Sequence, residues 1–550
     1  MKRRGLIQGL RARRAHRRTR AIMRGYRRLR ASGELSRISR LREALTVRQI
    51  DEIGRRASPT LFGAGVASAE VVVRQFALTR FASVTLVQAL LRAVGRREGV
   101  VHPLPARWRD IVEEHGFRVS RVRSALLWNG CVVLYAGFGA FTMLRKLVAG
   151  IKATLTSAPE LGRHVVFDTL PIGALPRPAS DGRSFDVISW YDQWPARIPD
   201  LDAMCHGASV PPTKARSGTR VVTAPIIPML VGWTRLVRFA AWSAAATGVA
   251  IVGILGGRWW HSLLMKEAAD AAIVRFQPAG RLAREYLFHN SGWVYRPLWT
   301  HEAARSGARI SLYFYSTNTE AFRLGAEYPP VSYGYAAMAW PHYIVWDDYQ
   351  ADFIRRAVGA DASISVAGPI WFQGSSHDLE PLPAKTVAVF DVQPVRNSFY
   401  QGLGLEQEYY LPATSLAFLG GIIDATRRVG ARVAFKRKRE MGSLAHPRYR
   451  RFVQRLDERS NVTAIQPEAA AHRLIESSAA VLSMAFTSTA IIGRDLGKPS
   501  AYYDPTGLLR NDDRAAHGIP VLSGPAELEA WLAAALGEAP AERMPRRAVS

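Results

Sequence analysis

The stretch AAVLSMAFTSTAIIGRDLGKPSAYYDP, residues 479–505, decides the fold of the second half of the chain. Its residues 480–484 are apolar, which is typical of a buried parallel strand. A helix is expected over residues 490–496, because Gly497 can take the left-handed position that ends a helix. Residues 500–503 then resume an extended run. The pattern therefore predicts a strand, a helix and a second strand, which is one unit of an α/β fold.

Hydroxyl side chains stand at the junction between this strand and this helix. Thr487, Ser488 and Thr489 lie at the carboxyl end of the strand, where the helix is expected to begin. Unpaired N–H groups and the helix dipole both point to such a place, so it suits a phosphate group. The alternative interpretation is that Thr487 or Ser488 only caps the helix. The local sequence leaves both interpretations open.

The composition indicates a folded protein of two or more domains with an anionic partner. The chain has 550 residues and a formal net charge of +29. Its first 58 residues hold 19 Lys and Arg against 4 Asp and Glu. Such a basic head suggests a phospholipid surface or a nucleic acid as partner. A solvated tail is the alternative for the first thirty or so residues.

The two cysteines and the absence of several sequence motifs argue against a disulfide-rich, metal-binding, secreted or serine-hydrolase protein. Cys131 and Cys205 are the only cysteines, so neither a disulfide framework nor a metal cluster can be built from them. This fits a reducing compartment, and the basic head is not followed by the apolar core of a signal peptide. No His or Cys set has metal-ligand spacing, and no nucleophile-elbow pattern supports hydrolysis.

Two uncharged stretches, residues 124–144 and 239–257, are near the length that spans a bilayer. Two spans would carry residues 145–238 across the membrane, although this segment is rich in Lys and Arg. Because that placement violates the positive-inside bias, buried or interfacial helices are expected instead.

Apolar runs separated by helical or turn-rich segments predict two parallel sheets, one after the other. The first set of expected strands comprises residues 164–167, 185–190, 271–276, 308–315 and 343–346. The second set comprises residues 385–390, 431–435, 462–465, 480–484 and 500–503, with helices over residues 407–428, 447–457, 472–477 and 490–496.

Charged groups follow several of these strands. Asp391 and the Lys436-Arg437-Lys438-Arg439 cluster lie at expected carboxyl ends in the second half, where ligands of parallel sheets bind. Cations beside a helix N-terminus suit a diphosphate or a sugar-linked nucleotide. Asp168 is a candidate general base of the first half. Asp347 and Asp348 either orient a hydroxyl or begin a helix.

Short motifs over most of the chain add a family resemblance. They are Arg24-Gly25-Tyr26 with Leu29, Val166-Phe167-Asp168 with Leu175-Pro176, Ile188-Ser189-Trp190-Tyr191, Trp340-Pro341-His342-Tyr343 with Val345-Trp346-Asp347, Gly368-Pro369-Ile370-Trp371-Phe372, and Phe390-Asp391 with Pro394. With Ala485-Phe486-Thr487-Ser488, the chain resembles the polysaccharide biosynthesis proteins named for a Pro-Phe-Thr-Ser motif. The first position of the motif departs, since Ala485 stands where the family has Pro.

The resemblance implies bacterial surface glycan assembly, and the two-half layout is similar to that of GT-B glycosyltransferases. In that class the C-terminal half holds the donor nucleotide and the acceptor enters from the N-terminal half. The expected fold is α/β, with two Rossmann-like (GT-B-like) domains, a basic helical N-terminal region and apolar helical insertions. The expected parts are a basic region (1–120), an acceptor domain (121–370), a linker (371–384), a donor domain (385–535) and a tail (536–550).

The sequence thus favours a metal-independent glycosyltransferase that moves a sugar from a nucleotide-sugar donor to a glycan or lipid-linked acceptor. It is expected in the cytoplasm, peripherally associated with the inner membrane through an anionic surface, with no cofactor besides the nucleotide-sugar substrate. Asp168 or Asp391 is the expected base. The expected donor-phosphate ligands are Lys436, Lys438, Arg439, Thr487, Ser488 and Thr489.

Two other functions remain as alternatives. A non-catalytic, membrane-associated polysaccharide assembly or export factor would bind the glycan without reacting. A nucleic-acid binder driven by the basic head is not expected, because this charge lies outside the two sheets and no recognised RNA or DNA module occurs.

Overall fold

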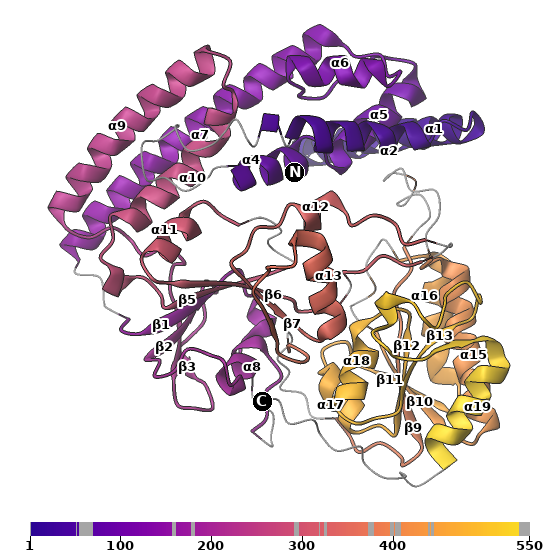
Figure 1. Ribbon diagram of the computed structural model, residues 1–550. Coiled ribbons are helices and arrows are strands. Elements are labelled where there is room, and N and C mark those ends of the chain that lie inside the picture. Colours follow the sequence, from indigo (N-terminus) through magenta and orange to yellow (C-terminus); the bar gives the residue numbers. More distant parts are fainter. Residues whose placement is uncertain are drawn as a thin grey trace.

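Two largely parallel sheets and a layer of helices make up the computed structural model (Figure 1). The expected fold class, α/β with two Rossmann-like halves, is confirmed. The structure describes residues 2–50, 52–53, 70–156, 161–177, 182–290, 296–317, 319–323, 327–371, 379–395, 401, 409–437, 441 and 445–537.

The second sheet has six parallel strands in the order β11-β10-β9-β12-β13-β14. This is the Rossmann order, whose topological switch point lies between its first and fourth strands, here β9 and β12. The strands are β9 (Thr386–Phe390), β10 (Arg432–Lys436), β11 (Val462–Ile465), β12 (Ala480–Met484), β13 (Ser500–Asp504) and β14 (Val521–Ser523). The helices are α15 (Pro412–Arg428), α16 (Pro447–Gln454), α17 (Ala471–Glu476), α18 (Ser488–Asp495) and α19 (Gly524–Gly537), with short 3-10 turns η4 (Leu456–Glu458) and η5 (Arg514–Ala516).

The strand–helix–strand unit of residues 479–505 is present as predicted. β12 is fully buried, and α18 begins two residues earlier than expected, at Ser488. Gly497 has φ +70° beyond the helix end, which is the left-handed conformation that the sequence predicts. A side chain at Gly493 would meet Ser500 and Val481, so α18 packs closely on the two strands that flank it.

The first sheet has eight strands in the order β3-β4-β2-β1-β5-β6-β7-β8, and only the β3–β4 pair is antiparallel. The strands are β1 (His164–Phe167), β2 (Ala203–His206), β3 (Thr213–Lys214), β4 (Arg220–Thr223), β5 (Glu285–His289), β6 (Arg309–Tyr313), β7 (His342–Val345) and β8 (Ile364–Val366). Its helices are α8 (Val187–Gln193), α11 (Trp299–Arg305), α12 (Tyr333–Ala336) and α13 (Asp348–Val358), with 3-10 turns η2 (Ile172–Ala174) and η3 (Ala279–Arg281). Its switch point lies between β1 and β5.

Two predicted strands of the first half are wrong. Residues 185–190 contain the start of α8, because the Asp186 carboxylate accepts hydrogen bonds from the N–H groups of Ile188 and Ser189, both at 3.0 Å. Residues 271–275 form the end of α10 (Trp260–Arg275), and Phe276 is its C-cap. This helix is buried on nearly every side, so its sequence lacks the polar face that distinguishes an amphipathic helix from a buried strand.

The N-terminal region is helical, and its helices pack closely. It comprises α1 (Lys2–Ala31), α2 (Ser36–Glu43), the π-helical turn η1 (Ala44–Ile50), α4 (Glu70–Arg80), α5 (Val84–Arg96) and α6 (Ala106–Glu114). A Cβ on Gly25 of α1 would lie 1.8 Å from the Leu91 carbonyl oxygen of α5, and one on Gly95 would lie 1.9 Å from that of Ala21. Glycine at both positions lets the two helix backbones touch.

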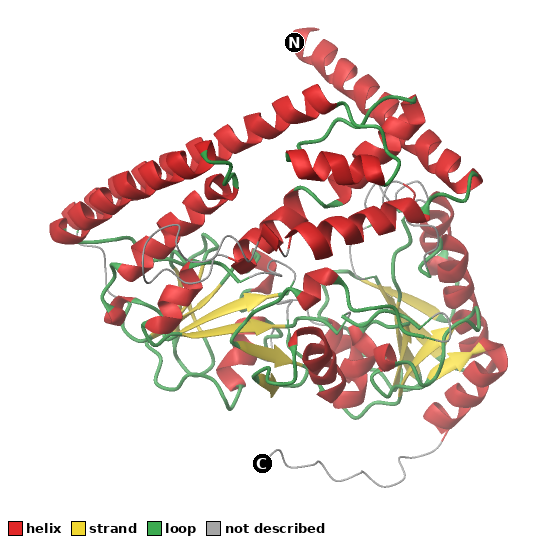
Figure 2. Cartoon of the chain, turned by 45° about the horizontal axis from the view of Figure 1, so that its top comes forward, coloured by secondary structure: helices red, strands yellow, loops and turns green. Residues whose placement is uncertain are grey.

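Two further helices hold the uncharged stretches. They are α7 (Arg121–Leu155) and α9 (Trp233–Leu255), which form a layer with α10 over the first sheet (Figure 2). Among the described residues, these two helices are long and apolar enough to cross a membrane by length and composition.

The two halves share one continuous hydrophobic core and several polar contacts. One of these polar contacts joins Asp347, which caps α13, to the second half. His517 Nδ1 lies 2.8 Å from both Asp347 carboxylate oxygens, and the Arg494 guanidinium donates to Asp347 Oδ2 at 3.2 Å. The alternative that Asp347 begins a helix is confirmed, since its carboxylate accepts from the Gln350 N–H.

Asp347→Asn is expected to lower the free energy of unfolding by about 2 kcal/mol, because buried hydrogen bonds to charged groups contribute about 1.5–3 kcal/mol. Burial opposes the ionisation of Asp347, yet the His517 hydrogen bond and charge bring its pKa below the ordinary 3.8. The contribution is therefore present above that pH and lost as the pH falls through the lowered pKa. Urea unfolding measures the change.

The matched control is Asp352→Asn on the same helix. Asp352 pairs with Arg355 one turn away at 2.7 Å, and its side chain is 66% exposed. Because exposed pairs contribute about 0–1 kcal/mol, little change is expected. Equal losses in the two variants would contradict a special role of the Asp347 contact between the halves.

Candidate functional site

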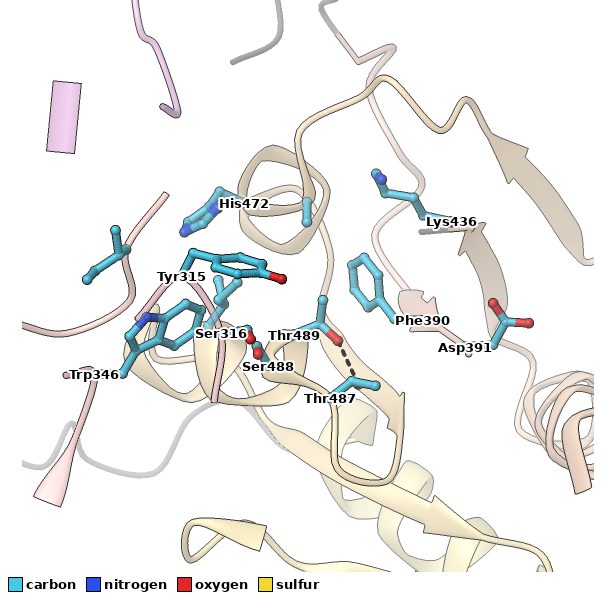
Figure 3. Close-up of a pocket in the computed structure, with 13 residues that line it drawn as sticks. Tyr315, Ser316, Trp346, Phe390, Asp391, Lys436, His472, Thr487, Ser488 and Thr489 are labelled. Carbon is cyan, nitrogen blue, oxygen red and sulfur yellow. Dashed lines mark hydrogen bonds between the residues drawn. The ribbon is translucent and has the colours of Figure 1, made fainter. Parts of the chain in front are cut away.

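A cavity of about 180 Å³ lies between the two halves. Its walls come from strand ends and helix starts of both sheets, and Figure 3 shows the polar and aromatic side chains that surround it. The first half contributes Tyr315, Ser316, Trp346 and Ile370, and the second half contributes Phe390, Asp391, Lys436, Ala471, His472, Thr487, Ser488, Thr489 and Ile492. The cavity therefore opens at the carboxyl end of the second sheet, beside its switch point, where ligands of such sheets bind.

The N-terminus of α18 forms part of this wall. Thr487 precedes the helix with extended backbone, at φ −91° and ψ 148°, and its side chain makes no hydrogen bond to the N–H groups of the first turn. The first-turn donors therefore remain available on the cavity side, together with the positive end of the helix dipole. This arrangement suits an anion such as a phosphate.

The three predicted hydroxyl ligands all line the cavity, and each also bonds within the protein. Thr487 Oγ1 donates to the Met484 carbonyl at 2.9 Å, and Thr489 Oγ1 lies 2.8 Å from Ser483 Oγ. Ser488 Oγ accepts from the Thr317 N–H at 3.0 Å, which is a contact from the first half. The hydroxyls thus shape the loop and tie it to the opposite wall. The peptide bond between Ala485 and Phe486 is cis.

Lys436 stands at the end of β10 with its ammonium group inside the protein. The side chain is buried, and Nζ donates to the Pro467 carbonyl at 3.0 Å and to the Arg437 carbonyl at 3.4 Å. An ammonium group has three donors, and the described residues accept from it at these two carbonyls, so the third donor can serve a ligand in the cavity. Burial lowers the Lys436 pKa to about 8, and the Glu468 charge acts in the opposite direction.

Asp391 stands at the end of β9, also buried. Its carboxylate accepts a hydrogen bond of 2.5 Å from the Tyr449 hydroxyl. Burial raises the Asp391 pKa to about 7, although this hydrogen bond and the Arg437 charge act in the opposite direction. A carboxylate whose pKa lies near neutrality is suited to accept a proton at physiological pH.

His472 and the aromatic wall are functional candidates that the sequence did not reveal. His472 Nε2 is buried and has no hydrogen-bond partner within the described part of the chain. Burial and the Arg183 charge lower the His472 pKa to about 3, so the ring is neutral. Tyr315 and Trp346 face it from the first half. Only the packing of the halves brings these residues together, so no local signal marks them.

The structure does not bring every predicted residue to the cavity. Asp168 lies at the end of β1, at the switch point of the first sheet, where the Thr169 hydroxyl donates to it at 2.6 Å. It does not line the cavity. Lys438 and Arg439 lie outside the described residues. Among the residues that are described, no group of three or more His, Cys, Asp or Glu side chains is placed to hold a metal ion.

Residues 242–532 match the family described as polysaccharide biosynthesis PFTS motif protein, and these residues are more than half of the chain. The chain belongs to this PFTS family. The match includes the whole second sheet, the cavity and the part of the first sheet from β5 onward. The family resemblance that the motifs indicate is thereby confirmed. No curated protein sequence matches the chain.

Solved structures match this PFTS-family chain only at low identity and low TM-score. UDP-GlcNAc 2-epimerase from Methanocaldococcus jannaschii, in complex with UDP-GlcNAc and UDP, is 9% identical, with 68% of this chain and 93% of that chain covered at a TM-score of 0.33. Trehalose 6-phosphate synthase from Burkholderia multivorans is 11% identical, with 68% and 90% covered at 0.32. Spinosyn forosaminyltransferase is 14% identical, with 69% and 91% covered at 0.32. The fold assignment rests on the strand orders given above.

Proposed function

We propose that the chain is a metal-independent glycosyltransferase of bacterial surface polysaccharide biosynthesis. It transfers a sugar from a nucleotide-sugar donor to a glycan or lipid-linked acceptor at the cytoplasmic face of the inner membrane. Membership of the PFTS family supports the pathway class. The observation that carries the proposal is the meeting of an uncapped helix N-terminus, a buried lysine and a buried aspartate at one cavity.

In the proposed reaction, the donor diphosphate binds at the first turn of α18 and at Lys436. Asp391 removes the proton from the acceptor hydroxyl, whose oxygen attacks the anomeric carbon. The bond between this carbon and the phosphate oxygen then breaks, and the nucleotide leaves with its negative charge at α18 and Lys436. Thr487, Ser488 and Thr489 hold the loop. Lys438 and Arg439 are further proposed phosphate ligands, and Asp168 is the alternative base.

Calorimetry against a panel of UDP-, GDP-, dTDP- and CMP-sugars tests the proposal. One class of nucleotide sugar is expected to bind with a Kd of about 1 μM to 1 mM, in EDTA as well as in Mg²⁺, because the site holds the phosphates with N–H groups and a lysine. Binding that requires added metal would contradict the metal-independent site. Absence of binding across the panel would favour the assembly or export factor.

A further inference from the structure

The outer faces of α7 and α9 form one apolar surface. The two helices are antiparallel neighbours, since Thr154 Oγ1 accepts from the Gly232 N–H at 2.9 Å near one end. Thr247 Oγ1 lies 3.6 Å from Met143 Sδ further along the pair. The exposed apolar side chains include Leu126, Val133, Leu134, Phe138, Phe141, Leu144 and Val148 on α7 and Val237, Val249, Val252 and Leu255 on α9.

Large apolar side chains on both helices stand mostly in solvent. Leu134 and Val252 are 73% and 72% exposed. Soluble monomers rarely expose a continuous apolar patch beyond a few hundred Å², on the order of 300–600 Å², and larger patches mark membrane or protein contacts. The uncharged windows of the two helices lie side by side here, so the apolar side chains gather instead of being scattered.

The inner face of α7 belongs to the folded protein along the same length. Trp128 packs edge-on against Trp259 at 4.8 Å, and Lys146 Nζ pairs with Asp270 Oδ1 at 2.6 Å. Between them, a side chain on Gly139 would clash with Met265. These contacts with α10 extend along about 27 Å of α7, at 1.5 Å per residue.

α10 lies in turn within the core of the first sheet, because Leu264 and Ala268 pack with residues of β1 and β5. A bilayer-spanning α7 would have to carry this core and the Lys146–Asp270 pair into hydrocarbon, which is costly. The contacts with α10 therefore favour helices that lie along a bilayer surface with only their outer faces in contact with lipid.

Cations stand at the ends of the apolar surface, and Arg121 at the start of α7 pairs with Asp110 and Glu113. Neither residues 121–155 nor residues 233–258 contain an acidic side chain. The exposed cations at the ends of the uncharged windows are Arg123, Arg145, Lys152, Arg238 and Arg258. Anionic headgroups would neutralise them, whereas a second copy of the chain, related by twofold symmetry, would bring like charges together.

We infer that the paired outer faces of α7 and α9 rest in the plane of an anionic bilayer. α7 and α9 lie parallel to the membrane there, with their apolar side chains at the acyl boundary and the bordering cations among the headgroups. This contact does not depend on the proposed sugar transfer. Vesicle binding and nucleotide-sugar binding are separate measurements, so either property can fail alone.

Sedimentation of the full chain with vesicles tests the contact. Phe138→Glu with Val252→Glu places two carboxylates on the surface, one on each helix. The control, Ile172→Glu with Leu508→Glu, adds the same charge at comparably exposed apolar residues elsewhere. Wild type and control are expected to bind phosphatidylglycerol-containing vesicles more than tenfold more tightly than phosphatidylcholine vesicles. The α7–α9 variant is expected to bind the anionic vesicles at least tenfold more weakly, with an unchanged melting temperature.

Three results would overturn the inference. Equal vesicle binding by the α7–α9 variant and wild type would exclude this surface. Resistance of the membrane-bound wild type to alkaline carbonate extraction would indicate spanning helices. A wild-type dimer that binds no vesicles, and that the α7–α9 variant converts to a monomer, would assign the surface to a contact between copies.

Discussion

Lys436→Met is expected to weaken nucleotide-sugar binding about 10- to 100-fold. A hydrogen bond to a charged group contributes about 1.5–3 kcal/mol, and 1.4 kcal/mol corresponds to a factor of ten. The substitution keeps most of the side-chain volume and removes the ammonium group that would contact the donor phosphate. Calorimetry with UDP-GlcNAc, or with whichever nucleotide sugar the wild type binds, measures the loss.

Lys385→Met is the matched control. Lys385 is exposed and immediately precedes β9, at the opposite end of the sheet from the cavity. Lys385→Met removes the same charge from the chain as Lys436→Met. Equal weakening of nucleotide-sugar binding in both variants would therefore show that the effect is only long-range electrostatics. A melting temperature that falls only for Lys436→Met would show that the lysine acts on the fold, and unchanged affinity would contradict its proposed role.

Asp391→Asn is expected to lower the rate of sugar transfer by about 10²–10⁴-fold, which is the usual contribution of a positioned general base. Donor affinity should remain, because the amide has nearly the shape of the carboxylate and can still accept from Tyr449. The kcat of transfer and the Kd of the donor, measured on the same preparation, separate the two effects. A full kcat in the variant would exclude Asp391 as the base.

The pH profile of the wild type follows from the same two groups. Below a pH of about 7, Asp391 becomes protonated and can no longer accept a proton, so the rate falls. Above a pH of about 8, Lys436 loses its charge, so donor binding weakens. A bell-shaped dependence of kcat/KM with a maximum between these values is therefore expected, and Asp391→Asn should lack the acid limb.

Tyr449→Phe gives a sharper check on the acid limb. The Tyr449 hydroxyl donates to the Asp391 carboxylate and favours its ionised form, so it opposes the effect of burial on the pKa. Its removal is expected to raise the Asp391 pKa further and to move the acid limb to higher pH. An unmoved acid limb would show that another group controls it.

The second sheet was largely predictable because its signals are local. Every strand except β14 was predicted as a short apolar run. Parallel strands end at one edge, so Asp391, Lys436 and Thr487 could be placed together from the sequence. The cavity also contains His472 and Tyr315, which reach it from a short helix and from the other half. The spacing of these residues along the chain does not predict that they share a cavity, because this depends on how the two halves pack.

The first sheet was harder because tertiary contacts hide its signals. β5 begins with Glu285, and a charged residue in a sequence ordinarily indicates a solvent-exposed position. Glu285 is buried, and its carboxylate accepts hydrogen bonds from Tyr191, Ser311 and Arg309, each at 2.6 Å. These partners come from distant parts of the chain, so the burial of Glu285 could not be predicted. The error at α10 was the opposite one, because a helical segment was predicted as a strand. Its sequence lacks a polar face, as the sequence of a buried strand does.

The strand order of the first sheet also bears on where the chain can be cut. The match to the PFTS family begins at residue 242, within α9, yet β1 and β2 precede it and β1 pairs directly with β5. A fragment trimmed to the matched residues would lack β1, so β5, a central strand in the full sheet, would become an unpaired edge strand. Such exposed edges promote aggregation. The stretch that identifies the family is therefore not a unit of folding.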